Sequence, residues 1–251
     1  MGKIKLENIA IVLVEPQIPE NIGSVARAMN NMGLKKLIIV NPANYDISII
    51  MKTATHNSIL ILEEMEISDN LLDAVGRYNY LVGTTARIGK NRPVLSTPKK
   101  LAKDLINISQ ENKIAILFGR EDKGLTNEQI KYCHTIVNIP TANLSSLNLA
   151  QAVMIICYEL YITNIEEETM ISYIPRLANK FELEGMYSHL KRALIKIGFI
   201  DPKNPEHWML NIRRMLSRYP LQAKEVQIIR GICRKIEWYI EHLTNNKDTK
   251  T

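Results

Sequence analysis

The sequence predicts an α/β fold with a parallel sheet, followed by a small all-helical domain. Continuous apolar runs such as 114–118 fit strands that are buried on both faces, as the strands of a parallel sheet are. Helix-like segments separate these runs, and β-type runs disappear from Tyr173 onward. We therefore expect an α/β domain over residues 1–165, a linker over 166–180 and a helical domain over 181–251.

The first part of the chain predicts a β-α-β unit. Residues 8–14 (NIAIVLV) and 36–40 (KLIIV) indicate two buried strands. Between them, Asn21 is the expected N-cap of a helix and Gly33 the residue just past its end. The apolar stripe of this helix consists of Ile22, Val25, Ala26, Met29 and Met32. Arg27 lies off that stripe, which leaves a solvated arginine and a functional arginine both open.

The stretch from residue 44 to residue 108 has a weaker pattern. We expect a helix near 50–58, a strand near 60–62, a helix over 70–77 capped by Ser68, a strand over 80–82 and a helix over 99–108. Thr84 and Thr85 follow the second of these strands, where small hydroxyl residues suit a ligand-facing loop or a plain turn. The basic, proline-broken segment 87–98 is either an RNA-contacting flap or a solvated loop.

Residues 114–163 predict two successive strand-loop-helix units. The first has a strand over 114–118 and a helix over 127–132 capped by Thr126; the second has a strand over 135–139 and a long helix capped by Ser146 or Asn148. Two such units place two loops at neighbouring strand ends, where open α/β sheets bind ligands. The spacing of Gly119 and Gly124 matches a phosphate-binding loop, but Leu125 stands where that motif needs lysine, so we reject it.

The carboxy-terminal part predicts helices near 181–197, 205–217 and 222–243, followed by a frayed tail over 245–251. Its cations are Lys191, Arg192, Lys196, Arg213, Arg214, Arg218, Lys224, Arg230, Arg234 and Lys235, interleaved with Tyr187, Trp208, Tyr219, Trp238 and Tyr239. Cations neutralise phosphates and aromatic rings stack on unpaired bases, so RNA contact is one interpretation. Basic solvated faces around an aromatic core are the other.

Composition narrows the class of protein. The net charge of +6 and the pI near 9.1 favour an acidic partner, nucleic acid first among them. Three widely spaced cysteines, Cys133, Cys157 and Cys233, indicate reduced thiols of a cytoplasmic protein, and five scattered histidines give no metal-ligand spacing. We see no signal peptide and no apolar run near the roughly 20 residues of a membrane helix, so we expect no membrane partner.

Three segments together point to a known family. They are residues 21–28 (NIGSVARA), residues 118–125 (FGREDKGL), and Ile139-Pro140 followed by residues 145–148 (SSLN). Their order and content closely resemble the three motifs of the SpoU/TrmH branch of the SPOUT methyltransferases. Within that branch the chain is most similar to the tRNA ribose 2′-O-methyltransferases of the anticodon loop. The similarity is strong over residues 5–165 and weaker in the helical domain.

The resemblance implies a parallel α/β sheet whose carboxy-terminal part forms a deep trefoil knot, an exception to the rule that chains avoid knots. It also implies binding of S-adenosylmethionine in that knot, a homodimer, and no metal. The cofactor-binding residues implied are Thr84, Thr85, Ala86, Gly119, Ile139, Ser145, Ser146 and Leu147. Backbone groups and small side chains dominate this set.

The implied reaction transfers a methyl group to the ribose 2′-hydroxyl of a pyrimidine nucleotide in the tRNA anticodon loop, at position 32. Arg27, Glu121 and Asn148 are the implied catalytic residues. Arg27 serves either as a general base or as a phosphate clamp that stabilises charge on the 2′-oxygen; guanidinium resists deprotonation, so we prefer the clamp. Glu121 would organise the cofactor loop and pair with Arg27, and Asn21 and Asn148 would cap helices and brace loops.

Two alternatives remain at this point: the same chemistry on another tRNA site or on ribosomal RNA, and a non-catalytic RNA-binding module with the same fold. One departure bears on the first. Many close relatives have a longer third-motif loop with a Pro-Glu/Asp-aromatic sequence, whereas this chain has Thr141-Ala142-Asn143-Leu144. Leu144 neither donates a hydrogen bond nor stacks as an aromatic ring does, which leaves the choice of target nucleotide open.

Overall fold

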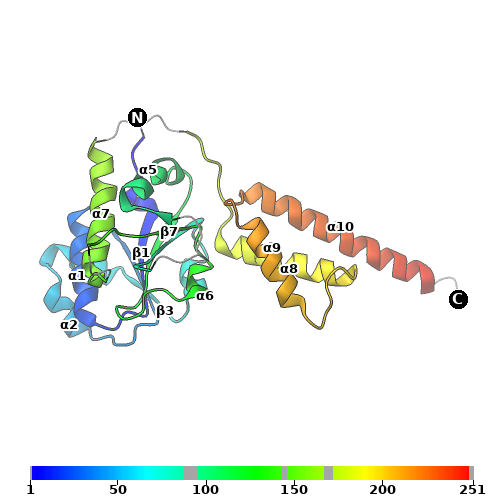
Figure 1. Ribbon diagram of the computed structural model, residues 1–251, viewed down its shortest axis with the longest axis horizontal. Coiled ribbons are helices and arrows are strands. Elements are labelled where there is room, and N and C mark those ends of the chain that lie inside the picture. The colour runs from blue at the N-terminus through cyan, green and yellow to red at the C-terminus, as the bar shows by residue number, and fades with distance from the viewer. Residues whose placement is uncertain (1, 88–94, 143–145, 167–171, 249–251) are drawn as a thin grey trace. The chain divides into compact units, whose positions relative to one another are not determined.

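The computed structural model describes residues 2–87, 95–142, 146–166 and 172–248 of the 251-residue chain. The chain forms two compact units, residues 1–175 and 176–251. A parallel sheet runs through the first unit, and the second consists of helices (Figure 1).

Seven strands of the described residues form the sheet, in the order β3-β2-β1-β6-β4-β7-β5, and every neighbouring pair is parallel. The central strands β1 and β6 are buried at every position, which confirms the predicted α/β class with a parallel sheet. The strands are β1 (Ile9–Val14), β2 (Lys36–Val40), β3 (Glu66–Ser68), β4 (Tyr80–Thr84), β5 (Leu95–Ser96), β6 (Ile114–Phe118) and β7 (Thr135–Val137).

Helices cover both faces of the sheet because successive strand residues point to opposite sides. Ile9, Ile11 and Leu13 of β1 pack in one core with α1, α5 and α7, whereas Ala10 and Val12 pack in a second core with α4 and α6. The helices of this unit are α1 (Pro19–Asn31), α2 (Ile47–Thr53), α3 (Ile59–Glu63), α4 (Leu71–Val75), α5 (Pro98–Ile108), α6 (Asn127–Ile130) and α7 (Leu149–Glu166).

The second unit contains α8 (Lys180–Lys196), α9 (Pro205–Leu216) and α10 (Ala223–Asp248), which pack around Met186, Tyr187 and Ile200. The predicted tail over 245–251 is wrong for residues 245–248, since no glycine or proline follows Leu243 to end the helix. Residues 249–251 lie outside the described residues. None of the helices in the described part is long and apolar enough to cross a membrane.

Several local predictions were wrong where the pattern was short. Residues 60–62, predicted as a strand, belong to α3, and the edge strand β3 was missed. α1 begins at Pro19, two residues before the predicted N-cap Asn21, and Asn70 rather than Ser68 caps α4. β7 ends at Val137, which places Ile139 in the loop that follows.

Candidate active site

A cavity of about 340 Å³ lies beside the carboxyl ends of β4 and β6. Sequence reasoning placed the loops after β6 and β7 at neighbouring strand ends; in the structure β4 lies between these two strands, so its loop joins theirs. Of the eight predicted cofactor-binding residues, seven line this cavity: Thr84, Thr85, Ala86, Gly119, Ile139, Ser146 and Leu147. Ser145 and Leu144 lie outside the described residues.

The loop after β6, residues 119–124, forms the second part of the cavity wall. It turns back on itself so tightly that it needs glycine. A Cβ atom on Gly119 would lie 2.2 Å from the backbone C of Gly124 and 2.2 Å from the backbone N of Leu125. Gly124 has φ of +65°, and its N–H donates to the carbonyl of Arg120 at 2.8 Å. Bare backbone therefore forms this part of the wall.

Backbone and side-chain amide groups connect the loop after β4 to the loop after β7. The N–H of Thr85 donates to the carbonyl of Val137 at 2.9 Å, and the side chain of Asn138 donates back to the carbonyl of Thr85 at 2.8 Å. Thr84 Oγ1 donates to the carbonyl of Leu117 in the neighbouring strand β6 at 2.9 Å. Sequence reasoning missed Asn138, because the predicted strand 135–139 included it, whereas β7 ends at Val137.

A chain of hydrogen bonds links the three sequence motifs. Asn148 Nδ2 donates to Asn21 Oδ1 at 2.9 Å, and Asn21 Nδ2 donates to Glu121 Oε1 at 2.8 Å. Asn148 Oδ1 also accepts from the N–H groups of Ala150 and Gln151, so it caps α7 as predicted. Asn21 braces this chain from inside α1 instead of capping that helix.

Glu121 is held at the amino terminus of α1. Its carboxylate accepts from the backbone N–H groups of Gln17 at 2.9 Å and Ile18 at 3.3 Å, where the helix dipole favours negative charge. The predicted pairing of Glu121 with Arg27 does not occur in the described part of this single chain. Backbone amides and Asn21 occupy the carboxylate instead.

Arg27 lies on the exposed side of α1 and lines a groove between α1 and α7, not the cavity itself. Leu147 lines both the groove and the cavity, so the two are adjacent. Within the described residues the Arg27 side chain forms no hydrogen bond or ion pair. Its guanidinium is therefore available to an anionic ligand.

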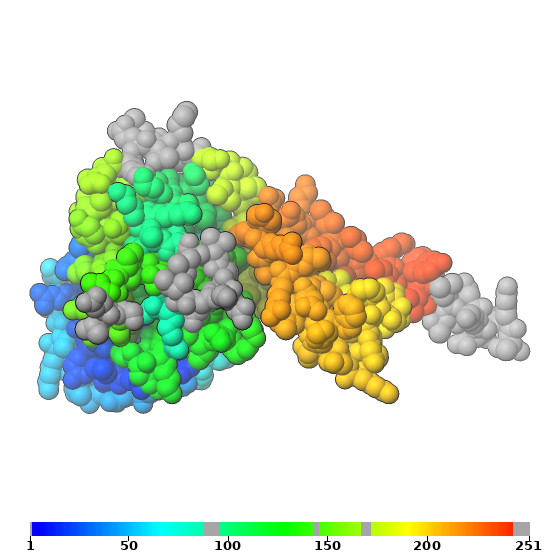
Figure 2. All heavy atoms as spheres, in the orientation of Figure 1, coloured from blue at the N-terminus to red at the C-terminus, as the bar shows by residue number. Residues whose placement is uncertain are grey.

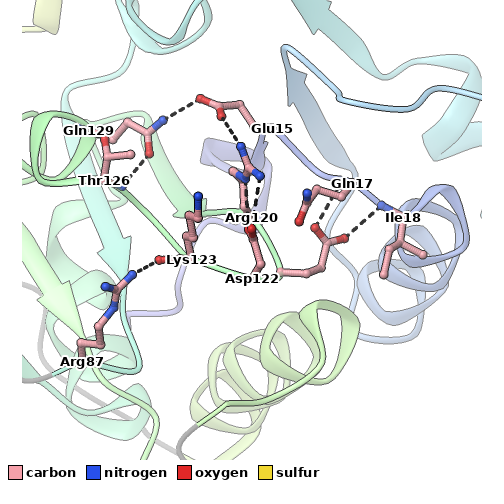
Figure 3. Close-up of polar contacts among 10 residues, drawn as sticks. Glu15, Gln17, Ile18, Arg87, Arg120, Asp122, Lys123, Thr126 and Gln129 are labelled. Atoms are coloured by element: carbon pink, nitrogen blue, oxygen red, sulfur yellow. Dashed lines mark hydrogen bonds and ion pairs between the residues drawn. The ribbon is translucent and has the colours of Figure 1, made fainter.

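Charged side chains of the loop 119–124 and of the segment after β1 form a second network (Figure 3). Arg120 contacts Asp122 in bidentate fashion at 3.1 and 3.2 Å and Glu15 at 3.7 Å. The hydrogen bond from Arg120 lowers the pKa of Asp122, so this carboxyl stays ionised. Arg87 donates from Nη2 to the carbonyl of Lys123 and thereby joins the loop after β4 to the loop after β6. Sequence reasoning missed Glu15 in this network, because its partners Arg120 and Gln129 are about a hundred residues away. It also missed Gln129, although the capping box of Gln129 with Thr126 was a local signal.

Among the described residues, histidine, cysteine, aspartate and glutamate side chains do not gather in a group of three that could hold a metal ion. The chemistry that the site can offer comes from backbone amides, amide side chains, the guanidinium of Arg27 and the carboxylate of Glu121, which N–H groups of Gln17, Ile18 and Asn21 hold in place.

Comparison with known proteins gives matches to both units. The model of the SpoU rRNA Methylase family matches residues 8–158, and the model of the TrmJ tRNA methyltransferase C-terminal domain matches residues 181–249. The tRNA (cytidine/uridine/adenosine-2′-O-)-methyltransferase TrmJ of Pseudomonas aeruginosa is 36% identical over 239 residues, covering 90% of this chain and 93% of the relative. The tRNA (cytidine/uridine-2′-O-)-methyltransferase TrmJ of Pectobacterium atrosepticum is 37% identical over 239 residues, covering 92% and 98%.

Solved structures give the same result. TrmJ from Z. mobilis ZM4 superimposes with a TM-score of 0.75 at 31% identity, covering 91% of this chain and 98% of that one. A probable methylase family protein from Haemophilus influenzae matches with a TM-score of 0.59 at 32% identity, covering 95% and 99%. The likeness thus extends over both units of the chain.

Proposed function

The chain belongs to the SpoU rRNA methylase family, and from this membership together with the likeness of both units to TrmJ proteins we propose that it is a tRNA (cytidine/uridine-2′-O-)-methyltransferase that uses S-adenosylmethionine. The observation that carries the proposal is the hydrogen-bonded chain Asn148–Asn21–Glu121, which joins all three motifs and reaches the cavity at Glu121. Its target is the ribose of a pyrimidine nucleotide in the anticodon loop, at position 32.

The cavity fits the cofactor that this reaction needs. Its volume of about 340 Å³ falls in the range of about 300–1,000 Å³ that is typical of small-molecule sites. Gly119 gives the wall a stretch of backbone without a side chain, and Thr84, Thr85 and Ser146 add polar groups to the lining. Bound S-adenosylmethionine supplies an electrophilic methyl group on a sulfonium. Membership of the family implies that the chain around this site is knotted.

Arg27 is the group that we assign to the RNA. A guanidinium is a fixed fork of N–H donors, so Arg27 serves as a clamp for phosphate and for negative charge that develops on the ribose 2′-oxygen. Glu121 and Asn148 act beside it by fixing the cavity loop and the start of α7 to α1, the helix that carries Arg27. Their contribution is alignment of the two reactants.

We also propose that a second copy of the chain covers the groove between α1 and α7. Apolar atoms of Ala28, Met154 and Ile155 line this groove, and the exposed Tyr158 and Ile165 lie further along α7. Large exposed apolar side chains on one helix are typical of protein interfaces. In such a homodimer Arg27 would lie at the subunit interface, beside the site that it serves.

The alternatives weighed on the sequence differ in their support. The name of the family favours ribosomal RNA, but the match of residues 181–249 to the TrmJ C-terminal domain favours tRNA. The available guanidinium of Arg27 and the intact chain from Asn148 to Glu121 speak against a module without catalytic function.

The test is to incubate the protein with unmodified tRNA transcripts and labelled S-adenosylmethionine and to map the methylated ribose by mass spectrometry. We expect one 2′-O-methylpyrimidine in the anticodon loop. Arg27→Ala should lower kcat by about 10²–10³, as loss of a charge-stabilising donor does, without weakening the binding of S-adenosylhomocysteine. Arg77→Ala, which removes an exposed arginine paired with Glu66, is the matched control and should remain fully active. Absence of methyl transfer to every tRNA tested would refute the proposal.

A further inference from the structure

Glu15 has a backbone conformation that few glutamates adopt. It follows the last residue of β1 and has φ of +53°, in the left-handed region that favours glycine. Its N–H donates to the carbonyl of Val40 at 2.7 Å, which fixes the turn. A side chain that is retained at such a position, where glycine would be less strained, calls for a role of the side chain itself.

The Glu15 carboxylate reaches two residues that control the cavity loop. Oε1 accepts from Gln129 Nε2 at 3.0 Å, and Oε2 lies 3.7 Å from Arg120 Nη1 (Figure 3). Gln129 is in turn a member of the capping box of α6: its Oε1 accepts from the N–H of Thr126 at 2.8 Å, and its own N–H donates to Thr126 Oγ1 at 3.2 Å. Glu15 thus holds the loop 119–124 directly at Arg120 and indirectly, through Gln129 and its bond to Thr126, beyond the end of the loop.

A second anchor lies on the same connecting segment. Glu121, in the middle of the loop, accepts from the N–H groups of Gln17 and Ile18. In the amide orientation that satisfies both neighbours, Gln17 also accepts from Arg120 Nη2 at 3.0 Å and donates to Asp122 Oδ1 at 3.1 Å. The segment 15–18 therefore grips the loop at three successive residues, Arg120 to Asp122, and then leads directly into α1.

We infer that Glu15 is a positioning residue, which acts through Arg120 and Gln129 to hold the loop 119–124 in the shape that binds the methyl donor. The inference rests on the proposed function for the identity of that donor, and it deepens that proposal by adding a residue outside the three motifs. The side chain of Glu15 is 30% exposed and that of Arg120 is 31% exposed, so solvent weakens their ion pair. The hydrogen bond from Gln129 to Glu15 therefore contributes much of the stabilisation of the loop.

Glu15→Gly separates the contribution of the carboxylate from that of the backbone conformation. Glycine adopts φ of +53° without strain, so the substitution removes only the side chain. In the protein without cofactor, we expect hydrogen exchange in peptides spanning residues 119–130 to become about fivefold faster, the factor expected for one ordinary hydrogen bond. Calorimetric titration should show S-adenosylhomocysteine binding weakened by a similar factor, with tRNA affinity unchanged. Glu15→Gln keeps an acceptor for Gln129 and should recover most of the protection.

Glu128→Gln is the matched control. Glu128 lies in α6 beside Gln129, but it pairs with the exposed Lys131 at the end of that helix and not with the loop 119–124. It should exchange and bind as the unaltered protein does. Unchanged exchange in Glu15→Gly would overturn the inference, whatever the protein binds. If S-adenosylhomocysteine fails to bind the unaltered protein, the proposed function fails, and the exchange measurement still decides whether Glu15 holds the loop.

Discussion

At the scale of single residues, the cavity depends on atoms that are missing as much as on those present. Gly119 has a backbone carbonyl carbon and an amide nitrogen where its side chain would begin. Neither neighbour is the flexible end of a side chain, so an added methyl group cannot be accommodated by a change of rotamer. The loop itself must move, and with it the wall of the cavity.

Gly119→Ala should therefore weaken the binding of S-adenosylhomocysteine by about tenfold or more, a cost of about 1.4 kcal/mol, and should also lower the Tm of the first unit. Gly231→Ala is the matched control. Gly231 lies inside α10 with open space around its Cβ position, so the same substitution should stabilise the second unit by about 0.5–1 kcal/mol and leave binding intact. Isothermal titration and thermal melts measure both effects. Equal binding by the two variants would contradict the steric argument.

The site residues that sequence reasoning found share one property: they lie in or beside short stretches whose content is distinctive by itself. Thr84, Gly119 and Ser146 belong to this class, and all three line the cavity. Glu15 and Asn138 were missed because their importance comes from partners 114 and 53 residues away. Such pairs become visible only once the strand order is known.

At the scale of secondary structure, the length of an apolar pattern decided what could be predicted. Residues 114–118 and the stripe of α1 are long enough to fix both type and burial. Residues 60–62 are three apolar residues, and such a run fits a strand or one turn of helix equally well. In the structure they belong to α3, in which Leu60 is exposed while Ile61 and Leu62 pack in the core.

The helices of the second unit sort its cations into two groups. Lys191, Arg192, Lys196 and Arg213 each pair with a glutamate of the same unit. Among the described residues, those without a carboxylate within ion-pair distance and exposed to solvent include Arg214, Arg218, Lys224 and Arg234. Residues 214–224 belong to the end of α9, the connecting turn and the start of α10, which form a surface coloured orange in Figure 2.

Arg214→Gln/Arg218→Gln should therefore weaken tRNA binding more than Lys191→Gln/Lys196→Gln, although each double variant removes two positive charges. Each phosphate group that no longer meets a cation should reduce the slope of log K against log salt by about 0.7–0.9. Fluorescence anisotropy with labelled tRNA over a series of salt concentrations measures the affinity and the slope together. Equal weakening in the two double variants would show that net charge alone governs binding and that the pairing within the unit is irrelevant.

At the scale of the whole molecule, the two units can be observed separately. The chain has two tryptophans, Trp208 and Trp238, and both belong to the second unit. Their fluorescence therefore reports the folding of the helical unit, while ligand binding at the cavity, which lies in the first unit, reports the first. The effect of pH on stability can therefore be assigned to one unit in the full chain.

Acid should unfold the helical unit through its paired carboxylates. The hydrogen bond from Arg176 lowers the pKa of Glu182. Burial, the largest single influence on Glu184, would raise its pKa, but the hydrogen bond from Arg213 and the nearby charges of Lys180 and Arg213 together outweigh burial, so the pKa of Glu184 is lowered. A carboxyl whose folded pKa is lowered contributes stability that is present above its unfolded value, near 4.5, and is lost as the pH falls further. The Tm followed by tryptophan fluorescence should therefore fall steeply below about pH 4.5.

Arg176→Gln tests the assignment, because it removes the partner that lowers the pKa of Glu182. The variant should be less stable at neutral pH, where the pair is intact in the unaltered protein, and its Tm should fall less between neutral and acid pH, because Glu182 no longer releases a proton on folding. Arg234→Gln removes an exposed arginine that has no carboxylate within ion-pair distance among the described residues, and its Tm should follow that of the unaltered protein at every pH. An equal acid-induced fall in Tm for Arg176→Gln and the unaltered protein would assign the acid sensitivity to other groups.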